Sequence, residues 1–448
     1  MSRITFVPVL VVILAATGCG GLYGGLPPGG GPPPPGGGTV TVTLGQGVAW
    51  AAYQDGNGPW QRFSGASFQV TDPAGRYGFA YVCVIETSVA QVTVTQATVA
   101  ELRTLAAACE GDTAPPTAYH VTGRVTNVGT GAIASVHTVS DSDGGLSEGA
   151  SFDLYPTLAG TRDLVGLRST NPAGCPDRVV FRRDLMVNAG VSGQDLDFAG
   201  GSGFLARPFT VSGATAGRNL VAAQNLLTKN ETGVFVCGIS TPSGQWQAVD
   251  SGVIAEDLYL FVALADSGVS GGPEESALKY VSAVPDPGSQ SVTLPAPITG
   301  LSATGRNPLY RGLAYVSTTL PLRAYLLSHI QPGRWWIILV TAGWLGGASQ
   351  YQTPDLSQVN GWNSAWEMRA GVEIAWSGSV HLSNRGLEEQ PPIIIPAGRQ
   401  VSSQVRARLA QTSRMLARPR RRAGLASVQP GTEVQWAFSG ESRYTPTP

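Results

Sequence analysis

The chain has 448 residues, of which 58 are Gly and 32 are Pro, whereas charged residues make up only 13%. Gly and Pro at this density interrupt helices, which argues against an all-helical protein, and the 42% hydrophobic share excludes a disordered polyelectrolyte. The formal net charge of -1 argues against a nucleic-acid-binding protein, so no nucleic-acid partner is expected.

A short apolar run follows Arg3 and ends in the sequence AATGC, whose cysteine is Cys19. The run is too short to span a bilayer and is typical of a signal peptide, here residues 1–18. The AATGC end resembles the lipobox of bacterial lipoproteins, which implies cleavage before Cys19, lipidation of Cys19 and attachment to membrane lipid. Gly20 after the cysteine implies the outer membrane where a cell has one. An ordinary secretory signal with an incidental cysteine is the alternative.

The next residues form a Gly/Pro linker, residues 19–38 with the cysteine included. Between residues 20 and 38 all but three positions are Gly or Pro. Such a stretch cannot bury apolar area, so the sequence predicts a disordered tether. At roughly 3 Å per residue, the tether would hold the folded part some tens of Å from the membrane.

Four further cysteines, Cys83, Cys109, Cys175 and Cys237, make disulfides possible outside the cytoplasm. Cys83–Cys109 is the preferred bridge because the two are close in sequence and lie in apolar surroundings. Cys175–Cys237 is the second candidate, with two buried free thiols as its alternative. The chain has no CxxC motif and no His-rich cluster, so neither a metal site nor a cofactor is expected.

The first folded segment, residues 39–116, has a β pattern. The sequences DGNG at 55–58 and DPAG at 72–75 indicate hairpin turns between apolar runs. Thr98 and Glu101 have the spacing of a capping box. We therefore expect a β domain with one short helix that begins at this box.

The second segment, residues 117–200, contains strand-like and turn-like sequences in a recognisable order. The sequence VTGRV at 121–125 is followed by a strand-like run at 133–139, an acidic Gly turn at 141–145 and LAGTRDLV at 158–165. This order resembles the carboxypeptidase-regulatory-like, transthyretin-like β-sandwich domain, which implies a small, non-catalytic accessory or spacer module. Alternation and turn chemistry alone also predict a small antiparallel sandwich.

Two segments complete the chain, a β segment at 201–300 and a Trp-rich β segment at 301–448. Seven of the ten Trp residues lie in the Trp-rich segment. Its apolar run at 335–340 is typical of a buried strand. The chain as a whole is therefore predicted to be mainly β, with tandem antiparallel β-sandwich-like domains after a disordered Gly/Pro tether.

Two GxSxG sequences place Ser147 and Ser270 in the pattern of a serine-hydrolase nucleophile. Ser147 lies in a polar loop, whereas Ser270 follows a predicted strand and would need His329 or His381 as its base. Because Gly is so abundant, such a match is expected by chance, and loop chemistry is the preferred interpretation. We predict no catalytic residue and no enzyme, with a hydrolase based on Ser270 as an alternative.

Two further constellations have simpler structural interpretations. His120 and His137 fall on neighbouring predicted strands and are interpreted as surface residues. The paired oxygens of 55–58 and 141–144 have a spacing that calcium loops use, but no further ligand follows either pair. Hairpin turns explain both sequences without a metal.

Three tryptophans of the last segment, Trp362, Trp366 and Trp376, could form a platform for sugar rings. Exposed aromatic faces suit the C–H faces of carbohydrates, and Trp362 and Trp366 flank a loop-like sequence. Packing in a sandwich core is the alternative. Trp362 and Trp366 are therefore named as candidate ligand-binding residues.

The strongest charge feature is a run of eight Arg without an acid between residues 399 and 422. An apolar stripe within it predicts a basic amphipathic helix at 402–418, which could contact anionic lipid or glycan. A solvated surface helix or a mobile insertion is the alternative. The candidate binding residues are Arg406, Arg408, Arg414 and Arg418.

These features predict a lipid-anchored, extracytoplasmic protein that acts as a non-enzymatic binding or structural module of the cell envelope. One alternative is a glycan or peptidoglycan binder that uses the Trp-rich region, and another is a serine hydrolase. The expected partners are membrane lipid through Cys19 and either an envelope glycan or another envelope protein.

Overall fold

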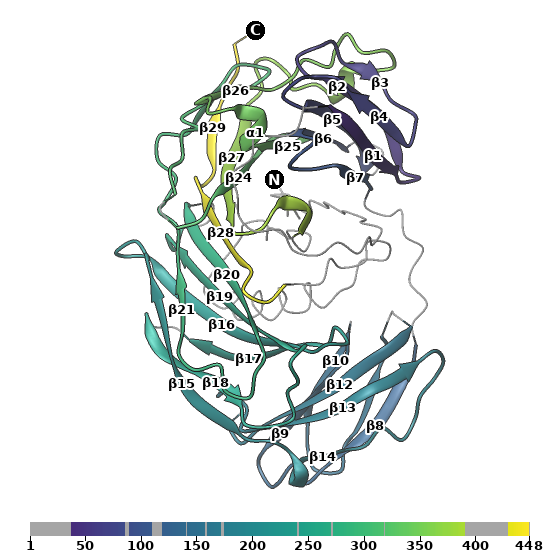
Figure 1. Cartoon of the computed structure of the whole chain (residues 1–448), viewed down its shortest axis with the longest axis vertical. Helices are drawn as coiled ribbons and strands as arrows, with labels where there is room; N and C mark the ends of the chain where they lie inside the picture. Colours follow the sequence, from purple (N-terminus) through teal and green to yellow (C-terminus); the bar gives the residue numbers. More distant parts are fainter. Residues whose placement is uncertain are drawn as a thin grey trace, which may run out of the picture.

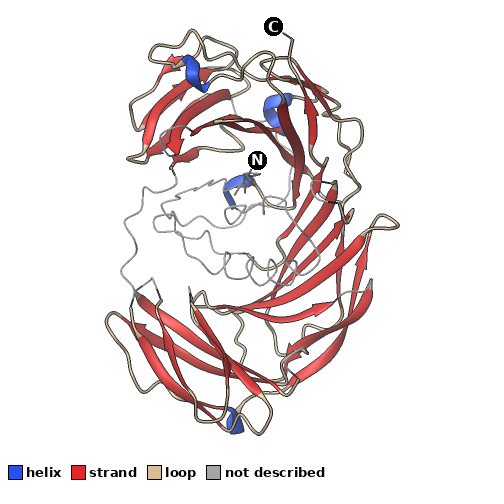
Figure 2. Cartoon of the chain, turned by 180° about the vertical axis from the view of Figure 1, so that it is seen from behind, coloured by secondary structure: helices blue, strands red, loops and turns tan. Residues whose placement is uncertain are grey.

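The structure of the chain is a computed structural model that describes residues 37–85, 89–109, 119–139, 141–156, 159–171, 174–239, 242–269, 272–317, 319–389 and 429–447. Strands dominate these residues, and the helices among them are single turns (Figure 2). The strands form several sheets that pack in pairs, so the predicted mainly β, sandwich-like architecture is confirmed.

One 13-stranded sheet runs along a side of the molecule and connects three of the four predicted segments (Figure 1). Its neighbours are antiparallel except for β25 and β6, which are parallel. In spatial order its strands are β17 (Gly233–Ile239), β16 (Asn219–Leu227), β19 (Leu258–Asp266), β20 (Glu274–Ser282), β28 (Glu433–Phe438), β27 (Ile374–Ser383), β24 (Leu322–Gln331), β25 (Arg334–Thr341), β6 (Val89–Thr98), β5 (Arg76–Ile85), β2 (Val48–Asp55) and β3 (Gln61–Arg62), with β29 (Ser442–Tyr444) paired to β27.

Strand β28 joins the segment 201–300 to the Trp-rich segment. Ala437 of β28 pairs with Glu275 of β20 on one side and with Val380 of β27 on the other. An unpaired strand edge leaves backbone N–H and C=O groups without partners, so pairing on both sides of β28 satisfies two edges at once. The sheet therefore continues across the predicted boundary at residue 300.

A small sheet covers one face of the long sheet near its β2 end. It has the order β4 (Ser67–Val70), β1 (Gly38–Leu44) and β7 (Thr104–Ala107). The alternating side chains Tyr77, Phe79, Tyr81 and Cys83 of β5 all lie in the core between these two sheets.

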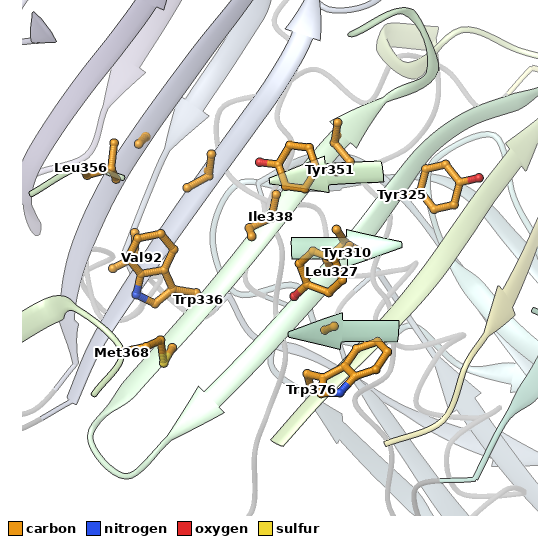
Figure 3. Packing of buried hydrophobic residues seen from close by; sticks show 14 of the residues in the cluster. Val92, Tyr310, Tyr325, Leu327, Trp336, Ile338, Tyr351, Leu356, Met368 and Trp376 are labelled. Carbon is orange, nitrogen blue, oxygen red and sulfur yellow. The ribbon is translucent and has the colours of Figure 1, made fainter. Parts of the chain in front are cut away.

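The opposite face of the same strands carries a second core (Figure 3). It is covered by the sheet β22 (Ser302–Thr304), β23 (Leu309–Arg311) and β26 (Gln350–Gln352), and by the segment 354–368. The short helices α1 (Ala342–Leu345) and η2 (Ser364–Trp366) lie on this side, and a third, η3 (Leu387–Glu389), follows β27. The apolar run at 335–340 forms β25, which confirms the predicted buried strand.

The remaining strands form two further sandwiches. The sheet β18 (Ser243–Val249), β15 (Phe204–Ser212) and β21 (Gln290–Thr293) packs on the long sheet around Trp246, Tyr259 and Phe261. In the segment 117–200, one sheet has the order β10 (Ser142–Leu146), β9 (Ile133–His137), β12 (Gly160–Ser169) and β13 (Arg178–Val187). The facing sheet has the order β11 (Ser151–Leu154), β8 (Val121–Thr126) and β14 (Leu196–Asp197), followed by η1 (Phe198–Gly200).

Two local predictions were wrong. The capping box at Thr98 does not begin a helix, because residues 99–101 form a turn and β7 follows, paired with β1. The DPAG sequence at 72–75 does form a turn, but it does not close a hairpin. It leads from β4 in the small sheet to β5 in the long sheet, whose strands pair with other partners. In both places the strand that follows the turn pairs with a strand distant in the sequence, β7 with β1 and β5 with β2, and this pairing decides the element.

Both predicted cysteine pairs are at disulfide distance. Cys83 and Cys109 have Cα atoms 5.4 Å apart and join β5 to the end of the small sheet that covers it. Cys175 and Cys237 have Cα atoms 5.0 Å apart and join the β12–β13 connection to β17. The second bridge therefore crosses the predicted boundary at residue 200.

Candidate functional site

Two glutamines flank a glycine in one row across the long sheet. Gln54 of β2 pairs with Gly78 of β5, and Gly78 pairs with Gln96 of β6. Residues in register point to the same face, so both side chains lie side by side there. Gln96 Nε2 donates to Gln54 Oε1 over 3.3 Å, and Gln54 Nε2 donates to the carbonyl of Gly58 over 2.7 Å. The two carboxamides are therefore held in defined orientations.

The indole of Trp60 lies over Gly78, between these glutamines. A Cβ atom at position 78 would lie 2.7 Å from the Trp60 ring and 3.1 Å from Gln54 Oε1. Only glycine leaves enough room for such a close approach. Trp60 remains half-buried, so part of its ring stays accessible.

The helix α1 forms a second wall and presents Trp344 and Leu345. Its N-cap residue Thr341 accepts a hydrogen bond from the Trp344 N–H, and the carboxylate of Glu101 accepts from the Thr341 hydroxyl and the Gly343 N–H. Glu101 also accepts from Thr98, so the capping-box hydrogen bonds do form. The predicted box therefore positions a helix far away in the sequence.

A third wall comes from β26 and the residues that follow it. Gln352 Nε2 donates to the backbone carbonyl of Asn307, and Thr353 Oγ1 donates to the carbonyl of Pro308 over 2.9 Å. Tyr351 pairs with Tyr310 of β23, which sets its ring against the core. This wall is thereby fixed to the loop before β23.

Together these walls border an open groove of about 630 Å³. This volume lies within the range of small-molecule sites. In the part of the chain that the structure describes, its lining contains six carboxamides, three aromatic rings and a single carboxylate, without Lys, Arg or His. The lining residues are Gln54, Asn57, Trp60, Gln96, Asn307, Trp344, Leu345, Ala348, Gln350, Tyr351, Gln352, Thr353, Pro354 and Asp355.

Two polar side chains in the lining are deeply buried yet incompletely hydrogen-bonded. Gln96 and Tyr351 are each 5% exposed. Gln96 Oε1 and the Tyr351 hydroxyl have no hydrogen-bond partner among the described residues. Buried polar atoms normally have partners, because an unpaired one costs free energy. These two atoms therefore lack a hydrogen-bond partner and are covered by neighbouring atoms, so a ligand in the groove would bond to them by displacing those neighbours.

The buried histidine and tyrosines around Tyr351 are neutral. The Tyr310 hydroxyl and His329 Nδ1 share a hydrogen bond of 2.8 Å, and His329 is fully buried. Burial lowers the pKa of His329 to about 3, so the imidazole is neutral at physiological pH. Burial likewise raises the pKa of Tyr351, which keeps its phenol protonated and able to donate. Figure 3 shows Tyr310 and Tyr351 next to each other over the sheet.

The tryptophans singled out by the sequence lie in the same core but outside the groove lining. Trp362 and Trp366 are half-buried and pack against Trp50. The ring centroid of Trp50 lies 5.0 Å from that of Trp362 and 6.2 Å from that of Trp366. Trp362 Nε1 donates to Glu367 over 3.1 Å. Trp376 is buried at 6% exposure. Much of their surface is therefore used for packing, as the alternative interpretation expected.

The residues of the hydrolase alternative do not assemble among the described residues. Ser147 lies in the turn between β10 and β11, whereas a nucleophile elbow requires a strand-to-helix turn. His329 pairs in register with Trp376, and His381 with Ala324, so the two imidazoles point to opposite faces of the long sheet. Ser270 lies outside the described residues.

The other candidate constellations are hydrogen-bonded turns and pairs. Asp55 accepts from the backbone N–H groups of Thr71 and Asp72. His120 contacts Asp153, whereas His137 contacts Ser135 in the facing sheet. Within the described part of the chain, no group of three or more His, Cys, Asp and Glu residues is arranged to hold a metal ion.

Several predicted residues lie outside the described residues. They are Cys19 of the lipobox-like sequence, linker residues 20–36, and the arginines of the predicted basic helix, Arg406, Arg408, Arg414 and Arg418; the last linker residue, Gly38, is instead the first residue of β1. In the described residues, no helix is long and apolar enough to cross a bilayer. No protein-family model and no curated protein sequence matches the chain.

The groove was not predicted from the sequence. Gln54, Trp60 and Gln96 lie 42 positions apart at most in the sequence but meet only when β2, β5 and β6 pair. The one available signal of the groove was Gln96, a polar residue whose side chain faces inward on a strand of buried neighbours. That signal indicates a polar site but gives no partner.

Proposed function

We propose that this chain is a membrane-anchored, extracytoplasmic protein of the cell envelope that binds a ligand in the groove and catalyses no reaction. The observation that carries the proposal is the pair Gln96 and Tyr351, which line the groove with buried polar atoms lacking a partner among the described residues. Such atoms suit a ligand that completes their hydrogen bonds.

The anchor is part of the proposal and is supported by the sequence. The lipobox-like end predicts a lipid on Cys19, and residues 20–38 would carry the folded part away from the membrane. Two disulfide pairs suit an oxidising compartment outside the cytoplasm. We place the lipid in the outer membrane of a cell with two membranes. The module at 117–200 then serves as a non-catalytic spacer.

A retention experiment tests the proposal. The full chain in detergent is immobilised and exposed to an extract of the cell envelope, and the bound material is assayed for carbohydrate, phosphate and protein. We expect Trp60→Ala to lower the retained material about tenfold, because a central tryptophan contributes much of the binding free energy at a site. Trp362→Ala is the matched control, since Trp362 is similarly buried but does not line the groove. Equal retention by both variants and the wild type would overturn the proposal.

A further inference from the structure

We infer that the groove is a binding site for a neutral saccharide, with Trp60 as the stacking ring and with Gln54, Gln96 and Tyr351 as partners of sugar hydroxyls. This inference rests on the proposed function, because it names the ligand class of the same groove. It assigns the sugar site to different residues from Trp362 and Trp366.

The charge of the lining excludes strongly ionic ligands. Among the described residues no Lys, Arg or His lines the groove, so an acidic ligand would meet no counter-charge from them. The one carboxylate, Asp355, is exposed and accepts the backbone N–H of Ser357 over 2.9 Å. A cationic ligand would therefore find a single carboxylate that is already hydrogen-bonded. A neutral ligand fits this lining best.

The hydrogen-bonding chemistry of the lining matches hydroxyl groups. Each carboxamide offers both donors and an acceptor, and a hydroxyl is also both donor and acceptor. Gln96 Oε1 needs a donor, and the protonated Tyr351 phenol can both donate and accept. A ligand with several adjacent hydroxyls can therefore form hydrogen bonds with the carboxamides, with Gln96 Oε1 and with the Tyr351 phenol at the same time. A purely apolar ligand would leave both buried atoms unpaired.

The aromatic side chains supply the apolar contact that a sugar ring needs. Trp60 lies over Gly78 between the two glutamines, and Trp344 stands on the wall formed by α1. A pyranose has an apolar face of C–H groups and a rim of hydroxyls, so a flat ring surrounded by carboxamides complements both parts. The row Gln54–Gly78–Gln96 places these two kinds of contact within one site.

A neutral peptide is the competing ligand, and the groove provides fewer of the contacts that bound peptides use. Peptides commonly add a strand to a free sheet edge or place side chains in apolar pockets. The edge strand in the lining, β26, has only three residues, and Gln350 and Gln352 on it are exposed. So short an edge gives few backbone hydrogen bonds. The saccharide is therefore the ligand that the lining favours.

Binding to a glycan array of neutral and acidic oligosaccharides tests the inference, with the full chain in detergent and calorimetry on the best ligand. We expect neutral oligosaccharides to bind and Trp60→Ala to weaken the affinity at least about tenfold. Asn57→Ala and Gln350→Ala alter exposed side chains of the lining, so they keep the test valid if Trp60→Ala fails to fold. Each should weaken binding measurably, whereas Trp362→Ala should not.

The outcomes separate this inference from the proposed function. Binding of acidic glycans only, or of no glycan, would overturn the saccharide inference. Retention of envelope material that depends on Trp60 but consists of peptide would also overturn it, and would leave the proposed function standing. Loss of binding in Trp362→Ala but not in Trp60→Ala would show that the ligand binds at the tryptophans outside the groove, and would overturn both proposals.

Discussion

Glu101 Oε1 accepts a hydrogen bond from the backbone N–H of Gly343 over 2.8 Å, across 242 positions of sequence. The same carboxylate accepts from Thr98 and from the Thr341 hydroxyl. A Cβ atom at position 343 would lie 2.6 Å from this carboxylate, so the contact depends on glycine. Glu101 thus ties the end of β6 to the helix that carries Trp344 into the groove.

We expect Glu101→Ala to destabilise the chain and weaken ligand binding together. The substitution leaves backbone and hydroxyl donors without their acceptor, and an unpaired buried donor costs about 1–3 kcal/mol. Urea unfolding followed by tryptophan fluorescence measures the free energy of unfolding. Glu441→Ala, at an exposed ion pair, is the control. Equal losses in the two variants would contradict the role of Glu101.

Gly78→Ala tests the contact that places Trp60. The new methyl group would overlap the indole, so we expect a shifted Trp60 ring, a changed fluorescence spectrum and a stability loss of about 1–3 kcal/mol. Gly144→Ala is the matched control, because a Cβ there meets only Ser135 at an ordinary 3.7 Å. If Gly78→Ala binds ligand as tightly as Gly144→Ala does, the position of Trp60 over Gly78 does not matter for the site.

The free energy of unfolding should decrease at acid pH because of the buried, neutral His329. The pKa of His329 is about 3 in the folded chain and 6.5 in its ordinary state, because burial disfavours the charged form. Between these pH values the unfolded chain takes up a proton that the folded chain does not. The contribution of His329 to stability is therefore fully present above pH 6.5 and is lost as the pH falls toward 3.

Urea unfolding of the wild type and of His329→Gln over a pH series isolates this contribution. The difference in free energy of unfolding should be constant above pH 6.5 and then fall by up to about 1.4 kcal/mol per pH unit. Glutamine cannot titrate but can still bond to Tyr310, which makes it a conservative replacement. A difference that does not change with pH would show that His329 titrates normally in the folded chain.

Arg183 connects the module at 117–200 to its neighbour. Its guanidinium donates to Asp163 over 3.0 Å and to Asp257 over 2.9 Å, and both carboxylates are fully buried. Arg183→Met would leave two buried charges without their cation, so we expect a loss of about 3–5 kcal/mol in calorimetric unfolding. Arg207→Met, which removes an exposed pair with Asp286, should cost far less. Similar losses in the two variants would show that the buried pairs of Arg183 stabilise the chain no more than the exposed pair of Arg207 does.

Cys19→Ser tests the proposed anchor. Serine has no thiol to acylate, so the variant should lose metabolic fatty-acid labelling and leave the membrane fraction. Wild-type chain processed in the same cells is the comparison, with immunoblotting of soluble and membrane fractions as the measurement. A variant that stays in the membrane fraction would contradict lipidation at this residue.

Local sequence predicted much of the secondary structure and little of the site. The turn at Asp55, the strand β25 and the bridge Cys83–Cys109 all follow from signals within a few tens of residues. The capping box at Thr98 predicted the right hydrogen bonds but the wrong element. The reason is that residues 104–107 pair with β1 as β7, and that Glu101 binds further donors on a distant helix; no local pattern contains either contact.

The sequence by itself determined that this protein is made of strands, because alternation, β-branched residues and Gly/Pro turns act over a few neighbouring positions. Only the tertiary structure decided which strands share a sheet. The parallel pairing of β25 with β6 and the insertion of β28 between β20 and β27 depend on edges that meet after folding. The row of Gln54, Gly78 and Gln96 exists for the same reason, since strand register sets which side chains become neighbours.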